Sequence, residues 1–291
     1  MIAPHTLSVV IPTYERPETL QACLDALGRE PFARDGVVEV IVTDDSRSER
    51  TKLLIANAYP WVRWRAGPRR GPAANRNAGA RAARGAWVLF VDDDCVPVAD
   101  FLSTWVAAIG PEVEMYEGAI HCADGVRSPM MWSPINPTGG CFWSANVCYR
   151  GDCFEWLGGF DERFPFAHME DTEFRERFRR AGLRERFVAE AAVDHPPRRL
   201  KFGAAYAAML ESEVLYRFLH GDRDAVTRRV WRGQLRGQLV RIWRYPWQRD
   251  SLVALASIVA QAWWLRGRAK LWEARWRTVR SIVPHGPSPT G

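Results

Sequence analysis

Four short segments that read as strands alternate with helical patterns in the first 91 residues, and this alternation constrains the fold more than any other feature of the sequence. The segments are residues 7–11, 37–42, 61–65 and 88–91. Strands that alternate with helices in this way form a parallel sheet with right-handed crossovers, covered by helices on both faces. The sequence therefore predicts an α/β fold with a Rossmann-like, mostly parallel sheet flanked by helices.

Two residues mark expected element ends. Pro12 follows the first apolar segment, and we expect the strand to stop there because proline cannot donate to a sheet ladder. Gly85 follows a helix of small residues expected over 73–84. We expect this glycine to end the helix in a left-handed conformation.

Carboxylates follow the second and fourth segments at the point where each ends. Asp44 and Asp45 follow the second, and Asp92, Asp93 and Asp94 follow the fourth. In open α/β sheets ligands bind outside the carboxyl ends of the strands, and a divalent cation would relieve the repulsion among adjacent carboxylates. In an extended backbone Asp92 and Asp94 would point to one side and Asp93 to the other. The alternative is an acidic turn that caps the next helix.

Several classes of protein are not expected from the motifs and the cysteines. A G-x-G-x-x-G motif is missing from the first turn and G-x-x-x-x-G-K-[ST] occurs nowhere, which argues against a Rossmann dehydrogenase and a P-loop NTPase. The six cysteines form no C-x-x-C pair and no cluster at zinc spacing, and the N-terminus lacks a signal-peptide pattern. These features favour a cytoplasmic location.

The last third of the chain is basic and rich in tryptophan. Residues 217–280 hold 15 lysines and arginines against 4 acidic residues, and seven of the 14 tryptophans lie beyond residue 230. Residues 251–265 carry no charge but are too few to span a bilayer. Two arrangements are expected for this part of the chain. It binds peripherally to an anionic membrane, which would be the inner face of the cell membrane, or it packs on the catalytic body as a helical subdomain. No nucleic acid is expected as a partner, because no recognisable binding module is present.

Six pieces of sequence stand in order along residues 6–200. They are VVIPTYERPETL, VIVTDDS, ANRNAGARAARG, LFVDDDCVP, GGFDERF and MEDTEFRERFRRAG. In this order and at this spacing they resemble the family 2 glycosyltransferases, which have the GT-A fold. The resemblance implies an inverting enzyme that transfers a sugar from a nucleotide-diphosphate sugar, expected to be a UDP-sugar, to a hydroxyl of a glycan or lipid-linked glycan. Residues 1–200 would then be the catalytic domain and 201–291 a basic, tryptophan-rich helical extension.

The resemblance also implies which residues contact the donor. Pro12 and Tyr14 would shape the nucleobase pocket, and Asp45 would accept a hydrogen bond from the uracil ring. Arg76 would reach the base or the diphosphate, and Asp93 would face the ribose. We therefore expect these five side chains to gather at one edge of the sheet.

The same resemblance assigns metal binding and catalysis to other residues. Asp94, with help from Asp92, would bind Mn²⁺ or Mg²⁺, which hard oxygen ligands select. His195 stands where some relatives carry a metal-ligating histidine, and the alternative is an ordinary loop histidine. Asp171 would be the general base that takes the proton of the acceptor hydroxyl. Asp171 could also cap its helix, a role that does not exclude catalysis.

Two rival functions remain open at this stage. A sugar-phosphate nucleotidyltransferase of related fold would have a Gly-rich N-terminal loop with Arg and Lys, where this chain has VVIPTYERPETL. A relative that binds nucleotide or membrane without catalysis would be expected to have a damaged acidic constellation, but all three acidic sites are present. Trp143, Asn146 and the loop 124–140 are candidates for contact with the acceptor.

Overall fold

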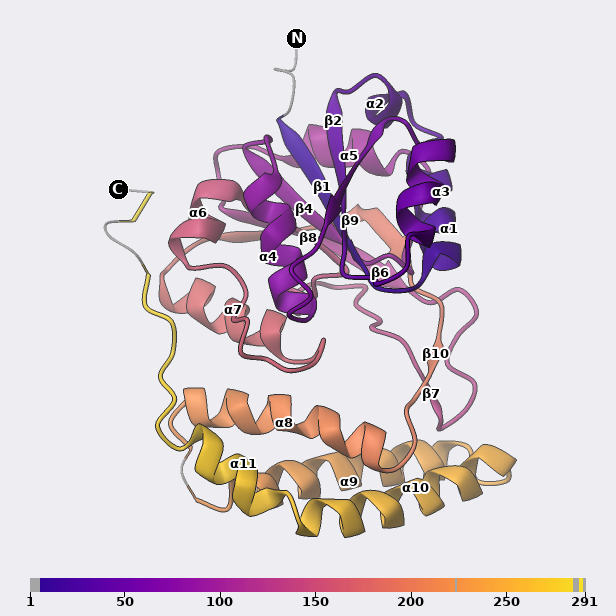
Figure 1. Ribbon diagram of the computed structural model, residues 1–291, viewed down its shortest axis with the longest axis vertical. Coiled ribbons are helices and arrows are strands. Elements are labelled where there is room, and N and C mark those ends of the chain that lie inside the picture. The colour runs from indigo at the N-terminus through magenta and orange to yellow at the C-terminus, as the bar shows by residue number, and fades with distance from the viewer. Residues whose placement is uncertain (1–5, 223, 285–287, 290–291) are drawn as a thin grey trace.

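The computed structural model describes residues 6–222, 224–284 and 288–289. A layered α/β body holds the first two thirds of the chain, and helices α8 to α11 form a further layer next to it (Figure 1). The strands are β1 (Leu7–Thr13), β2 (Val38–Asp44), β3 (Val62–Ala66), β4 (Trp87–Val91), β5 (Val96–Pro97), β6 (Met115–His121), β7 (Met131–Trp132), β8 (Asn146–Arg150), β9 (Glu185–Asp194) and β10 (Arg198–Arg199). The helices are α1 (Pro17–Leu27), α2 (Pro31–Arg34), α3 (Arg50–Ala58), α4 (Pro72–Ala82), α5 (Phe101–Ala108), α6 (Gly151–Trp156), α7 (Glu170–Arg180), α8 (Ala204–Leu219), α9 (Val226–Arg244), α10 (Arg249–Arg266) and α11 (Ala269–Trp276).

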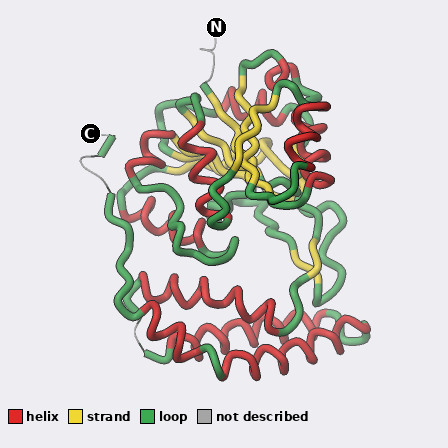
Figure 2. The backbone as a smooth tube through the Cα atoms, viewed as in Figure 1, coloured by secondary structure: helices red, strands yellow, loops and turns green. Residues whose placement is uncertain are grey.

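Eight strands form one mixed, mostly parallel sheet in the order β3-β2-β1-β4-β8-β6-β9-β5. Strands β3, β2, β1 and β4 are parallel, β8 runs antiparallel to β4 and β6, β9 is parallel to β6, and β5 is antiparallel to β9. Figure 2 shows these strands gathered between helices. The predicted α/β fold is confirmed.

The central strands form because their side chains are apolar on both faces. Every residue of β1 and of β4 is buried, as expected for strands covered by helices on each side. Helix α1 buries a stripe of Leu20, Leu24 and Leu27 against one face. The four parallel strands run toward the C-terminal helices in Figure 1, so their carboxyl ends lie on that side of the body.

The first strand does not stop at Pro12, and that expectation is wrong. The ladder between β1 and β4 ends at Val10 and Phe90, whereas the ladder between β1 and β2 continues to Thr13 and Asp44. Pro12 therefore sits where only one side of the strand is paired, a position in which a missing N–H is tolerated.

Gly85 is not a left-handed helix cap, so that expectation is also wrong. Helix α4 ends at Ala82, and Gly85 instead passes close beside β1. A Cβ on Gly85 would lie 2.6 Å from the backbone nitrogen of Ser8, and the Gly85 N–H donates to the Ser8 hydroxyl at 2.9 Å. Glycine is needed here for close approach and not for its backbone angles.

The backbone after β4 is not extended either. The N–H of Cys95 donates to the carbonyl oxygen of Asp92 at 3.1 Å, which closes a turn over the three aspartates. The simple alternation of Asp92 and Asp94 against Asp93 is therefore wrong, and each carboxylate has a different environment.

Helices α8 to α11 share a core of their own. Phe218, Leu265, Trp272 and Trp276 pack together in it. The layer also contacts the α/β body, where His168 Nε2 lies 3.1 Å from Glu213 Oε1 on α8. None of the helices in the described residues is long and apolar enough to cross a membrane.

Candidate active site

The carboxyl ends of β1, β2 and β4 meet at one edge of the sheet. The Thr13 hydroxyl at the end of β1 donates to Asp93 Oδ2 at 2.6 Å, and the Asp45 N–H donates to the Thr13 carbonyl oxygen at 3.0 Å. The edge thus brings Asp45 and Asp93 together around Thr13. This is the place where open α/β sheets bind ligands.

Asp93 is fully buried and shares an arginine with Asp94. Arg16, just before α1, places Nη2 at 2.5 Å from Asp93 Oδ1 and Nη1 at 2.8 Å from Asp94 Oδ2. Burial raises the pKa of Asp93 to about 7, although the Arg16 guanidinium opposes the shift. Burial also acts to raise the pKa of Asp94, but His195 and Arg16 outweigh it and hold that pKa well below its usual range.

Asp94 and His195 present two facing acceptors. Asp94 Oδ1 and His195 Nε2 lie 3.3 Å apart, both buried, and neither has a hydrogen-bond partner among the described residues. His195 Nδ1 lies 3.0 Å from the Pro196 carbonyl oxygen, so Nδ1 carries a hydrogen. Burial acts to lower the pKa of His195, but the Asp94 carboxylate outweighs it and raises that pKa, so Nε2 binds a proton when no cation is present and offers its lone pair when a cation replaces the proton. Two such acceptors need a proton or a cation between them. An oxygen and an imidazole nitrogen fit a divalent cation such as Mn²⁺.

Cys95 lies near the same pair but is a poor ligand for such an ion. Its sulfur is within reach of Asp94 and His195, with the three ligand atoms inside 4.8 Å of one another. The thiol, however, donates to the Ala145 carbonyl oxygen at 3.6 Å, and burial raises its pKa well above the usual value. A metal ligand must be the thiolate, so we assign Cys95 to packing.

Arg76 joins two acidic segments that are far apart in sequence. Its Nη2 lies 2.6 Å from Asp92 Oδ1 and its Nη1 lies 3.0 Å from Glu170 Oε1, with the arginine itself buried on α4. Asp92 is therefore turned toward Arg76 and is not part of the group formed by Asp94 and His195. The role of Arg76 toward the donor stays a prediction.

Asp171 lies one residue after Glu170 in the first turn of α7. It is not the N-cap, which is Met169, but its Oδ1 accepts the N–H of Thr172 at 2.7 Å. Burial raises the pKa of Asp171, while Arg76 opposes the shift. Burial and the charge of Asp171 also raise the pKa of Glu170. Glu170 is held in its ion pair with Arg76, so Asp171 is the better candidate of the two carboxylates for a general base.

The predicted nucleobase residues lie in or directly after β1 and β2, at the same edge of the sheet. Asp45 Oδ1 accepts the N–H of Arg69 at 2.8 Å, and burial raises the pKa of Asp45. A Cβ on Gly67 would lie 2.2 Å from Asp45 Oδ1, so this carboxylate fits only against a glycine. Tyr14 is 57% exposed and Pro12 is buried in β1. The structure brings Asp45 to the strand edge and leaves the Tyr14 ring open to solvent.

Sequence reasoning missed Arg16 and Thr13, although both stand next to Glu15 or near it in the VVIPTYERPETL piece. Glu15 Oε1 accepts the N–H groups of Arg47 and Ser48 at 2.7 and 3.2 Å, which ties the end of β1 to the loop before α3. Glu15 also has φ 52°, a left-handed conformation that only the surrounding contacts can hold. The sequence did hold a signal for Arg16, because an arginine that closely follows a predicted strand can reach the carboxylates at the ends of the neighbouring strands.

Trp132, in the loop 124–140 predicted to face the acceptor, and the predicted acceptor residue Trp143 form a small aromatic wall. Trp132 on β7 and Trp143 stack edge to face at 6.4 Å, and the Arg198 guanidinium lies over Trp132 at 5.2 Å. Arg198 Nη1 is also 4.0 Å from Asp94 Oδ2, which places this wall beside the acidic site. Asn146, in contrast, is fully buried and donates to the carbonyl oxygens of Ala119 and Ala191. It holds strands together and does not face an acceptor.

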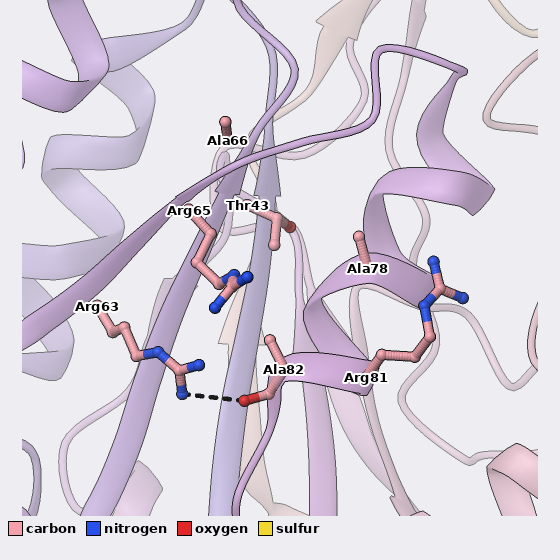
Figure 3. A pocket seen from close by; sticks show the side chains of 7 residues that line it. All are labelled: Thr43, Arg63, Arg65, Ala66, Ala78, Arg81 and Ala82. Atoms are coloured by element: carbon pink, nitrogen blue, oxygen red, sulfur yellow. Dashed lines mark hydrogen bonds between the residues drawn. The ribbon is translucent and has the colours of Figure 1, made fainter.

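A separate cavity of about 400 Å³ lies between β2, β3 and α4 (Figure 3). Arg63 donates there to the Ala82 carbonyl oxygen at 2.9 Å and pairs with Glu39. Arg81 lies 3.8 Å from Glu162. None of the strand-end aspartates lines this cavity, so we do not include it in the active site. Its lining residues are Thr43, Arg63, Arg65, Ala66, Ala78, Arg81 and Ala82.

Comparison with known proteins identifies the family of this chain. The family model for Glycosyl transferase family 2 matches residues 8–170. The protein named Glycosyltransferase AglE from Haloferax volcanii is 30% identical over 208 residues, covering 66% of this chain and 67% of its own length. The N-acetylglucosaminyl-diphospho-decaprenol L-rhamnosyltransferase of Mycobacterium tuberculosis is 27% identical over 239 residues, covering 65% of this chain and 75% of its own.

Solved structures share the fold at lower identity. The crystal structure of GalNAc-T7 with UDP, GalNAc and Mn²⁺ has a TM-score of 0.58 and 18% identity, and the match covers 94% of this chain and 58% of that chain. Such a likeness shows a common fold and nothing finer. The chain spans about a third or less of the length of several other curated relatives that it matches.

Proposed function

The chain belongs to glycosyl transferase family 2, and from that premise we propose that it transfers a sugar from a nucleotide-sugar donor to an acceptor hydroxyl with inversion at the anomeric carbon. The observation that carries this proposal is the buried pair of facing acceptors, Asp94 Oδ1 and His195 Nε2, beside Asp93 at the strand edge. A divalent cation held there would neutralise the charge that develops on the leaving diphosphate.

We propose that Asp94 and His195 hold this cation, with Asp92 as the weaker candidate because it faces Arg76. Asp45, Tyr14 and Pro12 would then contact the nucleobase, and Asp93 the ribose. The UDP and Mn²⁺ named in the GalNAc-T7 structure support a UDP-sugar and a manganese or magnesium ion here.

Asp171 is our candidate for the general base. Its carboxylate stands at the start of α7, and its raised pKa suits removal of a proton from a hydroxyl. The wall of Trp132 and Trp143 would position the acceptor, since sugar rings pack on aromatic faces through their apolar C–H groups. The decaprenol-linked substrate named for the mycobacterial relative supports a glycan or lipid-linked glycan as acceptor.

The division of the chain follows from the same proposal. Residues 1–200 would carry donor binding and catalysis, and residues 201–291 would form the basic, tryptophan-rich helical extension. A lipid-linked acceptor would place the enzyme at the inner face of the cell membrane, with that extension as the contacting part.

A thermal-shift screen of nucleotide sugars with and without Mn²⁺ tests the proposal. We expect a UDP-sugar to raise the melting temperature only when Mn²⁺ is present. Asp94→Asn should abolish this metal-dependent shift, whereas Asp171→Asn should keep the shift and lower the transfer rate by roughly 10² to 10⁴. Equal shifts with all nucleotide sugars, or full transfer activity in Asp171→Asn, would contradict the assignment. Release of pyrophosphate from a sugar phosphate and UTP would favour a nucleotidyltransferase instead.

A further inference from the structure

Helix α10 buries its polar side and exposes its apolar side. The side chains of Ser251, Ser257 and Gln261 are buried, and Ser257 and Gln261 hydrogen-bond to Gly203 and Gln238 on neighbouring segments. The residues on the opposite side of the helix are large, apolar and exposed. They are Leu252, Leu255, Val259 and Trp263. A helix of a soluble protein normally does the reverse.

Helix α9 and the turn after it add to the same apolar surface. Trp243 is 81% exposed and Trp247 is 96% exposed, and Leu239 and Val240 lie one turn before Trp243. Figure 1 places α9 and α10 together on the side of α8 that faces away from the sheet. We call the exposed apolar side chains of residues 239–263 the outer face. Exposed apolar groups in this number mark an interaction surface.

The charges around the outer face have one sign. The segment 236–270 has one acidic residue, Asp250, and seven basic residues, which are Arg236, Arg241, Arg244, Arg249, Arg266, Arg268 and Lys270. Asp250 is turned inward, where it pairs with Arg199 at 2.8 Å and with Ser128. The basic groups therefore surround the outer face without acidic partners of their own in that segment.

Tryptophan and arginine around an apolar helix side are the composition of elements that lie in the headgroup region of a bilayer. Arginine can keep its charge at the lipid phosphates while its stem covers apolar surface. The charge and the apolar side chains of the outer face thus suit one and the same partner.

We propose that the outer face docks on an anionic lipid bilayer, with α9 and α10 lying flat in the interface. A second copy of this chain fits less well, because it would bring the same arginines against each other without acidic partners. Anionic headgroups instead supply the opposite charge, and each basic residue near such a surface adds to the attraction. The inference deepens the proposed function, on which it rests for the membrane contact of the extension, by naming the face and the lipid charge that make that contact.

Docking through the outer face would also fix the position of the acidic site. The inward-facing Asp250 ties the first turn of α10 to Arg199 on β10, and the neighbouring Arg198 lies 4.0 Å from Asp94. In Figure 1 the parallel strands point their carboxyl ends toward the same helical layer. A membrane under α9 and α10 would therefore lie on the side of the body where the strand edge opens.

Sedimentation with vesicles tests the proposal on the full chain. The probes are vesicles of phosphatidylcholine alone and of phosphatidylcholine with about one third phosphatidylglycerol. We expect binding to the anionic vesicles to be at least about tenfold stronger, and to weaken as salt is raised. Tryptophan emission should shift to shorter wavelength on binding. Failure to sediment with anionic vesicles at low salt would overturn the proposal.

Two variants locate the contact. Trp243→Ser with Trp263→Ser should lower the affinity for anionic vesicles by about tenfold or more, because both rings leave the interface. The matched control is Leu53→Ser with Val98→Ser, two exposed apolar residues elsewhere, which should bind as the wild type does. An equal loss of affinity for anionic vesicles in both double variants would contradict binding through the outer face.

A charge variant and an oligomer measurement complete the test. Arg244→Gln with Arg249→Gln should weaken binding to anionic vesicles and flatten its salt dependence, whereas Arg29→Gln with Arg34→Gln should not. Light scattering tests whether a second copy of this chain covers the outer face instead. The proposal would be overturned if the wild type forms a dimer and does not bind lipid, and if the variant with Trp243→Ser and Trp263→Ser is a monomer. UDP and Mn²⁺ binding should be unchanged in every variant, so a failure here is distinguishable from a failure of the proposed function.

Discussion

Arg16 lies 2.8 Å from Asp94, through Nη1 and Oδ2, and so occupies one side of the carboxylate that we propose as a metal ligand. The same guanidinium lies 2.5 Å from Asp93. One arginine therefore balances two carboxylates that would otherwise repel each other. A divalent cation at Asp94 would add positive charge beside Arg16, so the two cations compete for the same carboxylates.

Replacing Arg16 should make the site depend more on metal. In Arg16→Gln, Asp93 and Asp94 lose their shared cation, and we expect the free energy of unfolding without Mn²⁺ to fall by about 1 kcal/mol, since the arginine is half-exposed. Mn²⁺ should restore more stability in this variant than in the wild type. Denaturant unfolding with and without Mn²⁺ measures both values, and Arg16→Lys is the control that keeps the charge. A smaller stabilisation by Mn²⁺ in Arg16→Gln would argue against competition.

The pH dependence of transfer should follow the Asp171 carboxylate. Asp171 acts as a base only when ionised, and burial raises its pKa, so the rate should fall as pH drops through that raised value. Glu170→Gln removes a neighbouring negative charge, which favours the ionised form and should move the acid limb of kcat/KM to lower pH. Arg76→Gln removes a positive charge and should move the limb to higher pH.

The opposite directions of these two variants provide the control for the pH experiment. If either residue had only a structural role, its variant would change the rate without moving the acid limb of kcat/KM, or both variants would move that limb in the same direction. Profiles of kcat/KM measured at saturating Mn²⁺ separate the titration of Asp171 from loss of metal at low pH. Acid limbs that coincide in the wild type and both variants would remove Asp171 from the role of base.

Gly67 controls the position of Asp45. A Cβ at residue 67 would lie 2.2 Å from Asp45 Oδ1 and 2.4 Å from Asn75 Oδ1, so Gly67→Ala must displace one of these side chains. We expect a loss of about 1–3 kcal/mol in stability from this overpacking, and weaker nucleotide binding. Calorimetric titration with UDP and Mn²⁺ measures the affinity. Gly237→Ala, where a Cβ meets nothing within 4 Å, should leave UDP affinity unchanged.

Much of the fold could be predicted because its signals are local. The apolar runs of β1, β2 and β4 and the stripe of α1 are readable in the sequence, and so are the carboxylates that follow the strands. The errors came from tertiary contacts. Pro12 stays in β1 because one ladder has already ended, and this depends on the neighbouring strand.

The residue types of the site could be predicted from the sequence, but which side chains contact each other could not. Sequence places three aspartates after β4, but only the folded chain shows that Asp92 turns to Arg76 while Asp94 faces His195. Arg76 and Glu170 are 94 positions apart, and no local pattern reveals such a contact. The inverted burial of α10 likewise depends on which side α8 and α9 cover.

His195 provides the sharpest test of the cation site, because its Nε2 has no hydrogen-bond partner among the described residues. If it is a metal ligand, His195→Phe should lower the affinity for Mn²⁺ at least about tenfold, since one of the donor atoms is lost. Mn²⁺ binding followed by electron paramagnetic resonance gives this affinity without any turnover. His121→Phe serves as the control histidine, because its side chain is exposed at the end of β6. If His195 is an ordinary loop histidine, both variants should bind Mn²⁺ as the wild type does, and the assignment of His195 would have to be withdrawn.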